Sequence, residues 1–117
     1  ALGCAQIEKL PIILQMKKHL NLRYKNALSK VQHILFLDEE TFPGSNFWLQ
    51  TILLDKTHLR YQKPIIEKCI EAGYQVRPAW TPLHTLPMFL SSPAMDLNNT
   101  ISFSNRIINL PSGAGLT

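Results

Sequence analysis

The segment 73–87 constrains the fold of this chain more than any other stretch, because it ends one regular element and cannot begin a long one. Gly73 is placed to adopt the left-handed backbone conformation that terminates a helix. Three prolines follow it, at Pro78, Pro82 and Pro87. Each fixes its own φ and moves the preceding residue out of the helical region. We therefore expect a helix up to Gly73, a short strand over 74–77, and then a stiff loop.

Three side chains of this segment have the chemistry to bind an anionic ligand with a flat surface. Arg77 carries a planar set of donors suited to phosphate or carboxylate, and Trp80 offers a large aromatic face. His84 can donate or accept a hydrogen bond near neutral pH. Taken singly, such residues are more often a surface arginine, a core tryptophan and a locally bonded histidine. The three are candidate substrate-binding residues. The sequence suggests no catalytic, cofactor-binding or metal-binding residue.

Composition and charge narrow the classes of function. The 117 residues are 45% hydrophobic, which fits one small domain with a modest core. No apolar run approaches the roughly 18–20 residues of a membrane-spanning helix, and no signal-peptide pattern opens the chain, so we expect a cytoplasmic domain. The net charge of +4 permits a polyanionic partner, but the basic residues are dispersed. A stand-alone basic module that binds nucleic acid or a protein partner is the alternative function.

Metal and redox chemistry find no support in the sequence. Cys4 and Cys69 are expected to be reduced, buried thiols on apolar helix faces, and neither has a histidine at ligand spacing. The histidines are scattered singly, at His19, His33, His58 and His84. The acidic cluster 38–40 lies in a predicted turn, which favours a solvated loop over a metal site.

The N-terminal part is expected to form two helices. Residues 1–10 have helical spacing, and a second helix should run from Pro11 to about Lys30, because proline lacks an N–H and favours a first helical turn. The second helix is amphipathic. Its apolar side carries Ile13, Met16, Leu20, Tyr24, Ala27 and Leu28, and its polar side carries Lys17, Lys18, Asn21, Lys25 and Asn26. We expect the apolar side to pack on a sheet.

The middle of the chain is expected to supply that sheet. Segment 31–37 is short and apolar, so helix and strand are both possible, and 38–45 is a turn cluster. Segment 46–54 is rich in aromatic and β-branched residues, which predicts a buried central strand. Within it, Trp48 is expected in the core in preference to a ligand site.

Helix and strand signals alternate from there to the end of the chain. A helix is expected over 65–72, and Pro64 either starts it or kinks a longer one. The strand at 74–77 follows, and a right-handed crossover results if it runs parallel to the preceding strand. Beyond the proline-rich loop we expect a helical turn over 88–90. A helix over 95–106 and a short strand over 107–112 complete the pattern.

Three stretches together resemble one protein family. Ala-Leu-Gly-x-Ala-Gln-x-Glu-x-Leu at 1–10, the run 76–89 and Asn-Leu-Pro-Ser at 109–112 resemble DegT/DnrJ-type nucleotide-sugar aminotransferases, with perosamine synthases and legionaminic-pathway enzymes nearest. The resemblance covers nearly the whole chain. It implies that residues 1–117 are a single α/β (α+β) C-terminal domain of a fold-type-I transferase dependent on pyridoxal phosphate. It also implies a short mixed sheet covered by helices, a cofactor-binding domain upstream, and a truncated final helix, whose N-terminal cap is expected at Thr117.

The same resemblance implies a function. The parent enzyme would transfer an amino group from glutamate to a 4-keto-6-deoxy nucleotide sugar for surface polysaccharide or related glycan synthesis. Pyridoxal phosphate would bind the missing domain, because no lysine here stands in the family's Schiff-base context, so this chain alone should be inactive. Arg77 would pair with a phosphate, Trp80 would stack on the sugar or base, and His84 would bind a sugar hydroxyl. The parent is expected to be a homodimer, with no membrane partner.

Overall fold

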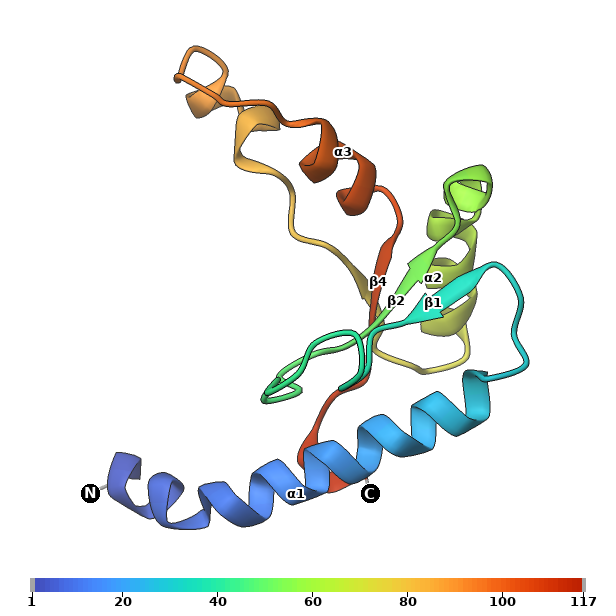
Figure 1. The fold of residues 1–117 in the computed structure, drawn as a ribbon. Helices are drawn as coiled ribbons and strands as arrows, with labels where there is room; N and C mark the ends of the chain where they lie inside the picture. The colour runs from blue at the N-terminus through green and yellow to red at the C-terminus, as the bar shows by residue number, and fades with distance from the viewer. Residues whose placement is uncertain (1, 117) are drawn as a thin grey trace.

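A four-stranded sheet joins the parts of this chain, which the computed structural model describes over residues 2–116 (Figure 1). Ala1 and Thr117, and with Thr117 the expected helix cap, lie outside the described residues. The strands are ordered β1 (Ile34–Phe36), β2 (Gln50–Leu54), β4 (Ile107–Leu110) and β3 (Arg77–Pro78). Together with the helices they confirm the α/β class. Segment 31–37, for which helix and strand were both open, contributes β1.

The strand pairing differs from the mixed sheet that was expected. All three neighbouring pairs are antiparallel, so β2 and β3 run in the same direction with β4 between them. Pro78 explains this order, since a residue without an N–H is confined to an edge strand. The central place goes to β4, which pairs on both of its sides. The crossover from β2 to β3 therefore passes over one strand.

One continuous helix, α1 (Leu2–Leu28), replaces the two helices that were expected. Pro11 lies inside it. The prediction of a break was wrong because the fixed φ of proline is itself compatible with a helix, and the lost hydrogen bond lies where the helix is exposed. The first half of α1 projects away from the sheet (Figure 1). None of the described helices has the length and apolar character needed to cross a bilayer.

The packed face of α1 is wider than its apolar stripe. Five of the six expected apolar residues are buried or half-buried, whereas Ala27 is exposed. Three residues expected on the polar side also turn inward, at Lys17, Asn21 and Lys25. The Nδ2 of Asn21 donates to Oε1 of Gln50 at 2.8 Å, and both side chains are almost fully buried. A buried amide is accommodated here because it has a partner.

The core lies between the sheet and α2 (Gln62–Glu71). Its fully buried members are Ile52, Leu54, Val76 and Ile108. Ile52 stands opposite Ile108 in the β2–β4 register, so the two central strands supply one continuous apolar surface. The second half of 46–54 is thus the buried central strand that was predicted. Cys69 packs against this core, whereas Cys4 is exposed, contrary to expectation; both are free thiols.

Helix α2, which precedes the proline-rich segment 73–87, begins and ends as its residue types indicate. After the 3₁₀ helix η1 (Lys56–Tyr61), α2 starts at Gln62, so Pro64 lies in its first turn and does not kink it. Gly73 ends it with φ +85°. The N–H of Gly73 donates to Ile70 O at 2.9 Å and that of Tyr74 to Cys69 O at 2.8 Å, which is the full glycine-type C-cap.

After β3 the chain leaves the sheet as an arm, defined as residues 79–104, and returns as β4 (Figure 1). The arm contains η2 (Leu83–Thr85), η3 (Pro87–Phe89) and α3 (Asn98–Ser104), so the helix expected over 95–106 is shorter at both ends. Arg106 closes the arm onto the sheet. Its Nη1 donates to Leu54 O at 2.9 Å and its Nε to Ser102 O at 2.8 Å.

Candidate functional site

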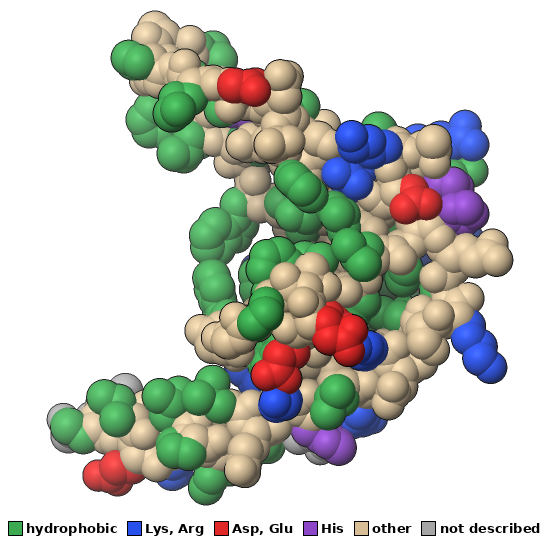
Figure 2. Space-filling model, viewed as in Figure 1, with side chains coloured by type: hydrophobic (Ala, Val, Ile, Leu, Met, Phe, Trp, Pro, Cys, Tyr) green, Lys and Arg blue, Asp and Glu red, His purple; other side chains and the backbone are tan. Residues whose placement is uncertain are grey.

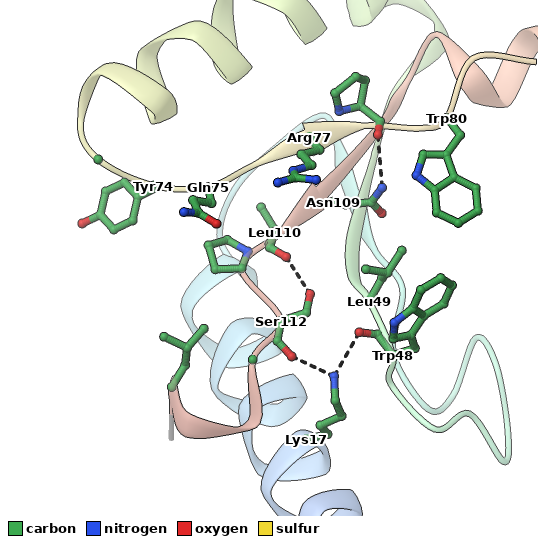
Figure 3. Close-up of a pocket in the computed structure, with 15 residues that line it drawn as sticks. Lys17, Trp48, Leu49, Tyr74, Gln75, Arg77, Trp80, Asn109, Leu110 and Ser112 are labelled. Carbon is green, nitrogen blue, oxygen red and sulfur yellow. Dashed lines mark hydrogen bonds between the residues drawn. The ribbon is translucent and has the colours of Figure 1, made fainter. Parts of the chain in front are cut away.

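An open pocket of about 780 Å³ lies where the β3–β4 edge of the sheet meets α1 and the loop before β2 (Figure 3). Its aromatic side chains are those of Trp48, Tyr74 and Trp80, and its polar or charged side chains are those of Lys17, Gln75, Arg77, Asn109 and Ser112. Within the described part of the chain, Lys17 and Arg77 are its charged lining residues, and no carboxylate lines it. The pocket is therefore electropositive and has aromatic walls.

Arg77 is held by the sheet with its guanidinium left for a ligand. It stands opposite Asn109 in the β3–β4 register, and the Asn109 Nδ2 donates to Pro78 O at 3.3 Å, which ties the edge strand down. No hydrogen bond or ion pair of the Arg77 side chain is found among the described residues. A fixed backbone with an unengaged guanidinium suits bidentate binding of a phosphate or carboxylate.

Two tryptophans form the aromatic side of the pocket. Trp80 is 81% exposed and Trp48 is 59% exposed. Their rings meet edge to face, with centroids 5.9 Å apart and an interplanar angle of 69°. Both rings thus present exposed aromatic surface to a planar ligand or a sugar ring.

The core position predicted for Trp48 was wrong, and its neighbour Phe47 takes that position. Phe47 adopts φ +50° and is 6% exposed. This left-handed residue reverses the path of the chain before β2 starts at Gln50, so the side that faces inward changes by one residue. Two hydrogen bonds hold that turn. The N–H of Phe47 donates to Ser45 Oγ at 3.1 Å, and the N–H of Trp48 donates to Asn46 Oδ1 at 3.0 Å.

Lys17 holds the floor of the pocket together. Its Nζ donates to the carbonyl oxygens of Ser112 at 2.8 Å and Trp48 at 3.0 Å (Figure 3), and to that of Phe47 at 3.2 Å. These bonds join α1 to the loop before β2 and to the turn after β4. Burial lowers the pKa of this ammonium group. The amphipathic pattern placed Lys17 on the solvent side, and no sequence signal marked its role, because its acceptors are backbone groups far along the chain.

The structure does not bring the three predicted substrate-binding residues together. Arg77 and Trp80 line the pocket, whereas His84 lines a separate hollow of about 420 Å³ within the arm. The N–H and Oγ1 of Thr85 both donate to Pro82 O, at 3.0 and 2.7 Å, and this turn carries the chain away from the sheet. Tyr74, which was expected only as a strand residue, lines the pocket with an exposed ring.

The pocket does not fit the cofactor that the family resemblance implies. Pyridoxal phosphate enzymes need a free lysine for the Schiff base and an acid beside the pyridine nitrogen. Lys17 is the lysine that lines this pocket, and its Nζ is engaged by three carbonyl groups. Among the described residues the lining also supplies no acid. What the pocket fits is an anionic ligand with a flat or sugar-like surface.

This chain is similar to several known proteins. EpsN of Bacillus subtilis, assigned as a pyridoxal phosphate-dependent aminotransferase, is 35% identical over 98% of this chain, and the GDP-perosamine synthase of Vibrio cholerae is 31% identical over 99% of it. The chain spans only 30% and 32% of these relatives. Among solved structures, PseC of Helicobacter pylori, an aminotransferase of pseudoaminic acid biosynthesis, has the same fold, with a TM-score of 0.89, 21% identity and coverage of 99% of this chain and 32% of its own.

The family assignment rests on a match that extends over the whole sequence. The model of the DegT/DnrJ/EryC1/StrS aminotransferase family matches residues 1–117. The matched region thus contains the pocket, the arm and α1 together. This chain belongs to the DegT/DnrJ/EryC1/StrS aminotransferase family.

Proposed function

We propose that this chain is the C-terminal, substrate-side domain of a larger cytoplasmic enzyme that uses pyridoxal phosphate to aminate a 4-keto-6-deoxy nucleotide sugar, with glutamate as the amino donor. The product would serve surface polysaccharide or related glycan synthesis. Family membership supports amino transfer, and the names of the relatives support a sugar substrate. Because the pocket lacks the groups that the cofactor requires, we assign cofactor binding to a part of the parent outside residues 1–117.

The observation that carries the proposal is the unengaged guanidinium of Arg77 beside two exposed aromatic faces. A nucleotide sugar offers a diphosphate and flat or ring-shaped surfaces, which are the partners that these groups accept. Arg77 pairs with phosphate oxygens. Trp80, with Trp48 beside it, stacks on the sugar or the base. Lys17 takes no direct part, since its ammonium group holds the pocket floor.

We assign two further kinds of contact in the parent enzyme to the arm: contacts between subunits and a contact to the sugar. Its large apolar side chains at Leu83, Met88, Leu90 and Met95 are each at least 66% exposed. We assign these side chains to contacts within a homodimeric parent, because several large apolar side chains exposed on one segment favour an interface. His84, which lies in the arm and outside the pocket, donates a hydrogen bond to a sugar hydroxyl in the assembled enzyme. Size-exclusion chromatography with light scattering on the parent tests the dimer, and a monomeric parent would contradict it.

The test uses the purified full-length parent. Its absorbance spectrum should contain the visible band of bound pyridoxal phosphate, and this band should shift when glutamate is added. Arg77→Gln should raise the KM for the nucleotide sugar at least about tenfold, because a charge-assisted hydrogen bond is worth about 1.5–3 kcal/mol. Trp80→Ala should raise that KM as well, and both variants should retain the band.

Arg60→Gln is the matched control, since the Arg60 guanidinium lies over the Tyr61 ring, outside the pocket, and is exposed. This variant should keep the wild-type KM. A parent without the band, or with a band that glutamate does not shift, would refute the enzyme assignment. An active enzyme in which Arg77→Gln and Trp80→Ala leave the KM unchanged would refute only the assignment of the substrate to this pocket, and not the enzyme assignment.

A further inference from the structure

We propose that His33, Asp55 and His58 form a binding site for one divalent transition-metal ion of the zinc class. Their ligand atoms all lie within 4.8 Å of one another. The sequence pattern shows these histidines as scattered and predicts no metal site, but the fold brings two of them to one carboxylate. In Figure 2, histidine side chains lie beside an acidic one at the right-hand edge of the molecule. None of the three residues lines the substrate pocket, so the proposal goes beyond the amino-transfer function.

Backbone hydrogen bonds place the three residues. Ile34 pairs with Leu54 in the β1–β2 register, so His33 and Asp55 are the next pair at the end of that ladder. The N–H of Asp55 donates to His33 O at 2.9 Å. Asp55 also precedes η1, and the N–H of His58 donates back to Asp55 O at 2.9 Å. The sheet end and the first turn of η1 thus hold all three positions before any ion binds.

The side chains lie within reach of one ion, which the stacked imidazoles must rotate to face. Nδ1 of His33 is 3.1 Å from Oδ2 of Asp55, and the rings of His33 and His58 are stacked with centroids 4.0 Å apart. A tetrahedral zinc site with bonds of about 2.0–2.1 Å has ligand–ligand edges of about 3.3 Å. The closer pair matches this spacing. No pair has to approach by more than about 1.5 Å, which rotation of an imidazole supplies.

A neighbouring hydroxyl prepares His58 for the ion. Thr57 Oγ1 lies 2.9 Å from His58 Nδ1. When this hydroxyl accepts a hydrogen bond from Nδ1–H, Nε2 keeps its lone pair for the metal, as in the outer-shell hydrogen bonds that orient metal-binding imidazoles. The His58 ring also stacks on Tyr61, at a centroid distance of 5.9 Å. Both contacts keep the His58 ring beside that of His33.

The donor set selects the class of ion. Two imidazoles and one carboxylate suit zinc, nickel or copper, whereas magnesium and calcium prefer oxygen ligands throughout. Three protein ligands leave a fourth position for water. The side chains of His33 and Asp55 are each 53% exposed, so an ion enters directly from solvent. A bound ion would join the start of β1 to η1 and stabilise this edge of the sheet.

The experiment is a titration of the full protein with Zn²⁺, in competition with a chromophoric chelator and without an affinity tag. Cys4→Ser serves as the background, because Cys4 is an exposed free thiol and cysteine thiolates are zinc ligands. We expect one ion per chain. His33→Asn, Asp55→Asn and His58→Gln should each weaken binding at least about tenfold, the loss typical of removing a group that supports a metal site. Asparagine is chosen at position 33 because His33 has φ +65°, which asparagine tolerates.

His19→Gln is the matched control, since His19 is exposed on α1 and belongs to no cluster, and it should bind zinc like the background protein. Nuclear magnetic resonance of the imidazole signals gives a readout that does not depend on the folding of a variant. Zinc should shift the signals of His33 and His58 and leave those of His19 and His84 in place. Absence of binding at millimolar zinc, binding in all three ligand variants as tight as in the background protein, or shifts confined to other residues would each overturn the proposal.

Discussion

Replacing Lys17 by methionine tests whether one ammonium group holds the pocket floor. A hydrogen bond to a charged group contributes about 1.5–3 kcal/mol to stability. The three bonds of Lys17 do not add fully, because the contact to Trp48 O is exposed and water can replace it, and because burial already disfavours the charged lysine. We therefore expect Lys17→Met to lower the free energy of unfolding by about 2–3 kcal/mol in total. Methionine keeps the length and helix propensity of the side chain.

The neighbouring lysine provides the control. Lys18 forms an ion pair of 2.7 Å with Glu39, but their side chains are 53% and 49% exposed, so Lys18→Met should cost less than about 1 kcal/mol. Urea denaturation of both variants measures the difference, with an unchanged m-value as the check on two-state unfolding. In the active parent, Lys17→Met should also raise the KM for the sugar substrate. Equal stability of the two variants, within about 0.5 kcal/mol, would refute the proposed role of Lys17.

Two further predictions concern the backbone and the pH dependence of stability. Gly73→Ala should destabilise the protein by about 1–2 kcal/mol in urea denaturation, because Gly73 has φ +85° while an added Cβ meets no atom within 4 Å; an unchanged midpoint would contradict the backbone explanation. For Asp38, the hydrogen bond from Lys25 and then that from Thr41 N–H lower the pKa to about 2. A carboxyl whose folded pKa lies below its unfolded value of about 3.9 stabilises the protein above pH 4 and loses this contribution as the pH falls through the folded pKa. The stability advantage of wild type over Asp38→Asn, about 1–2 kcal/mol at pH 6, should therefore fall below about 0.5 kcal/mol at pH 2. A difference that stays constant with pH would contradict this explanation.

The acidic cluster 38–40 shows where composition misleads about exposure. Its sequence favoured a solvated loop, and Glu40 conforms, with a side chain that is 83% exposed. Asp38 does not, because the bend at 38–41 turns its carboxylate towards Lys25 on α1, at 2.8 Å. This partner, Lys25, lies on the side of the helix that the sequence pattern assigned to solvent. Only the docking of α1 against this loop decides the burial of Asp38.

The features that depend on the chemistry of single residues follow from the sequence alone. Gly73 ends α2 because only glycine takes its conformation without strain, and Pro78 confines β3 to the edge of the sheet because it has no N–H. The apolar run in β2 predicts a buried central strand through its residue types alone. Such features are local, so a linear pattern contains them.

Contacts between distant segments, by contrast, arise only when the chain is folded. The exchange of Phe47 for Trp48 in the core follows from one left-handed residue, and the role of Lys17 follows from carbonyl groups that the sequence does not display. The approach of His33 to His58 requires the β1–β2 pairing and the turn of η1. These arrangements depend on backbone geometry and on the register between strands, and neither quantity is encoded in the spacing of residue types along the chain.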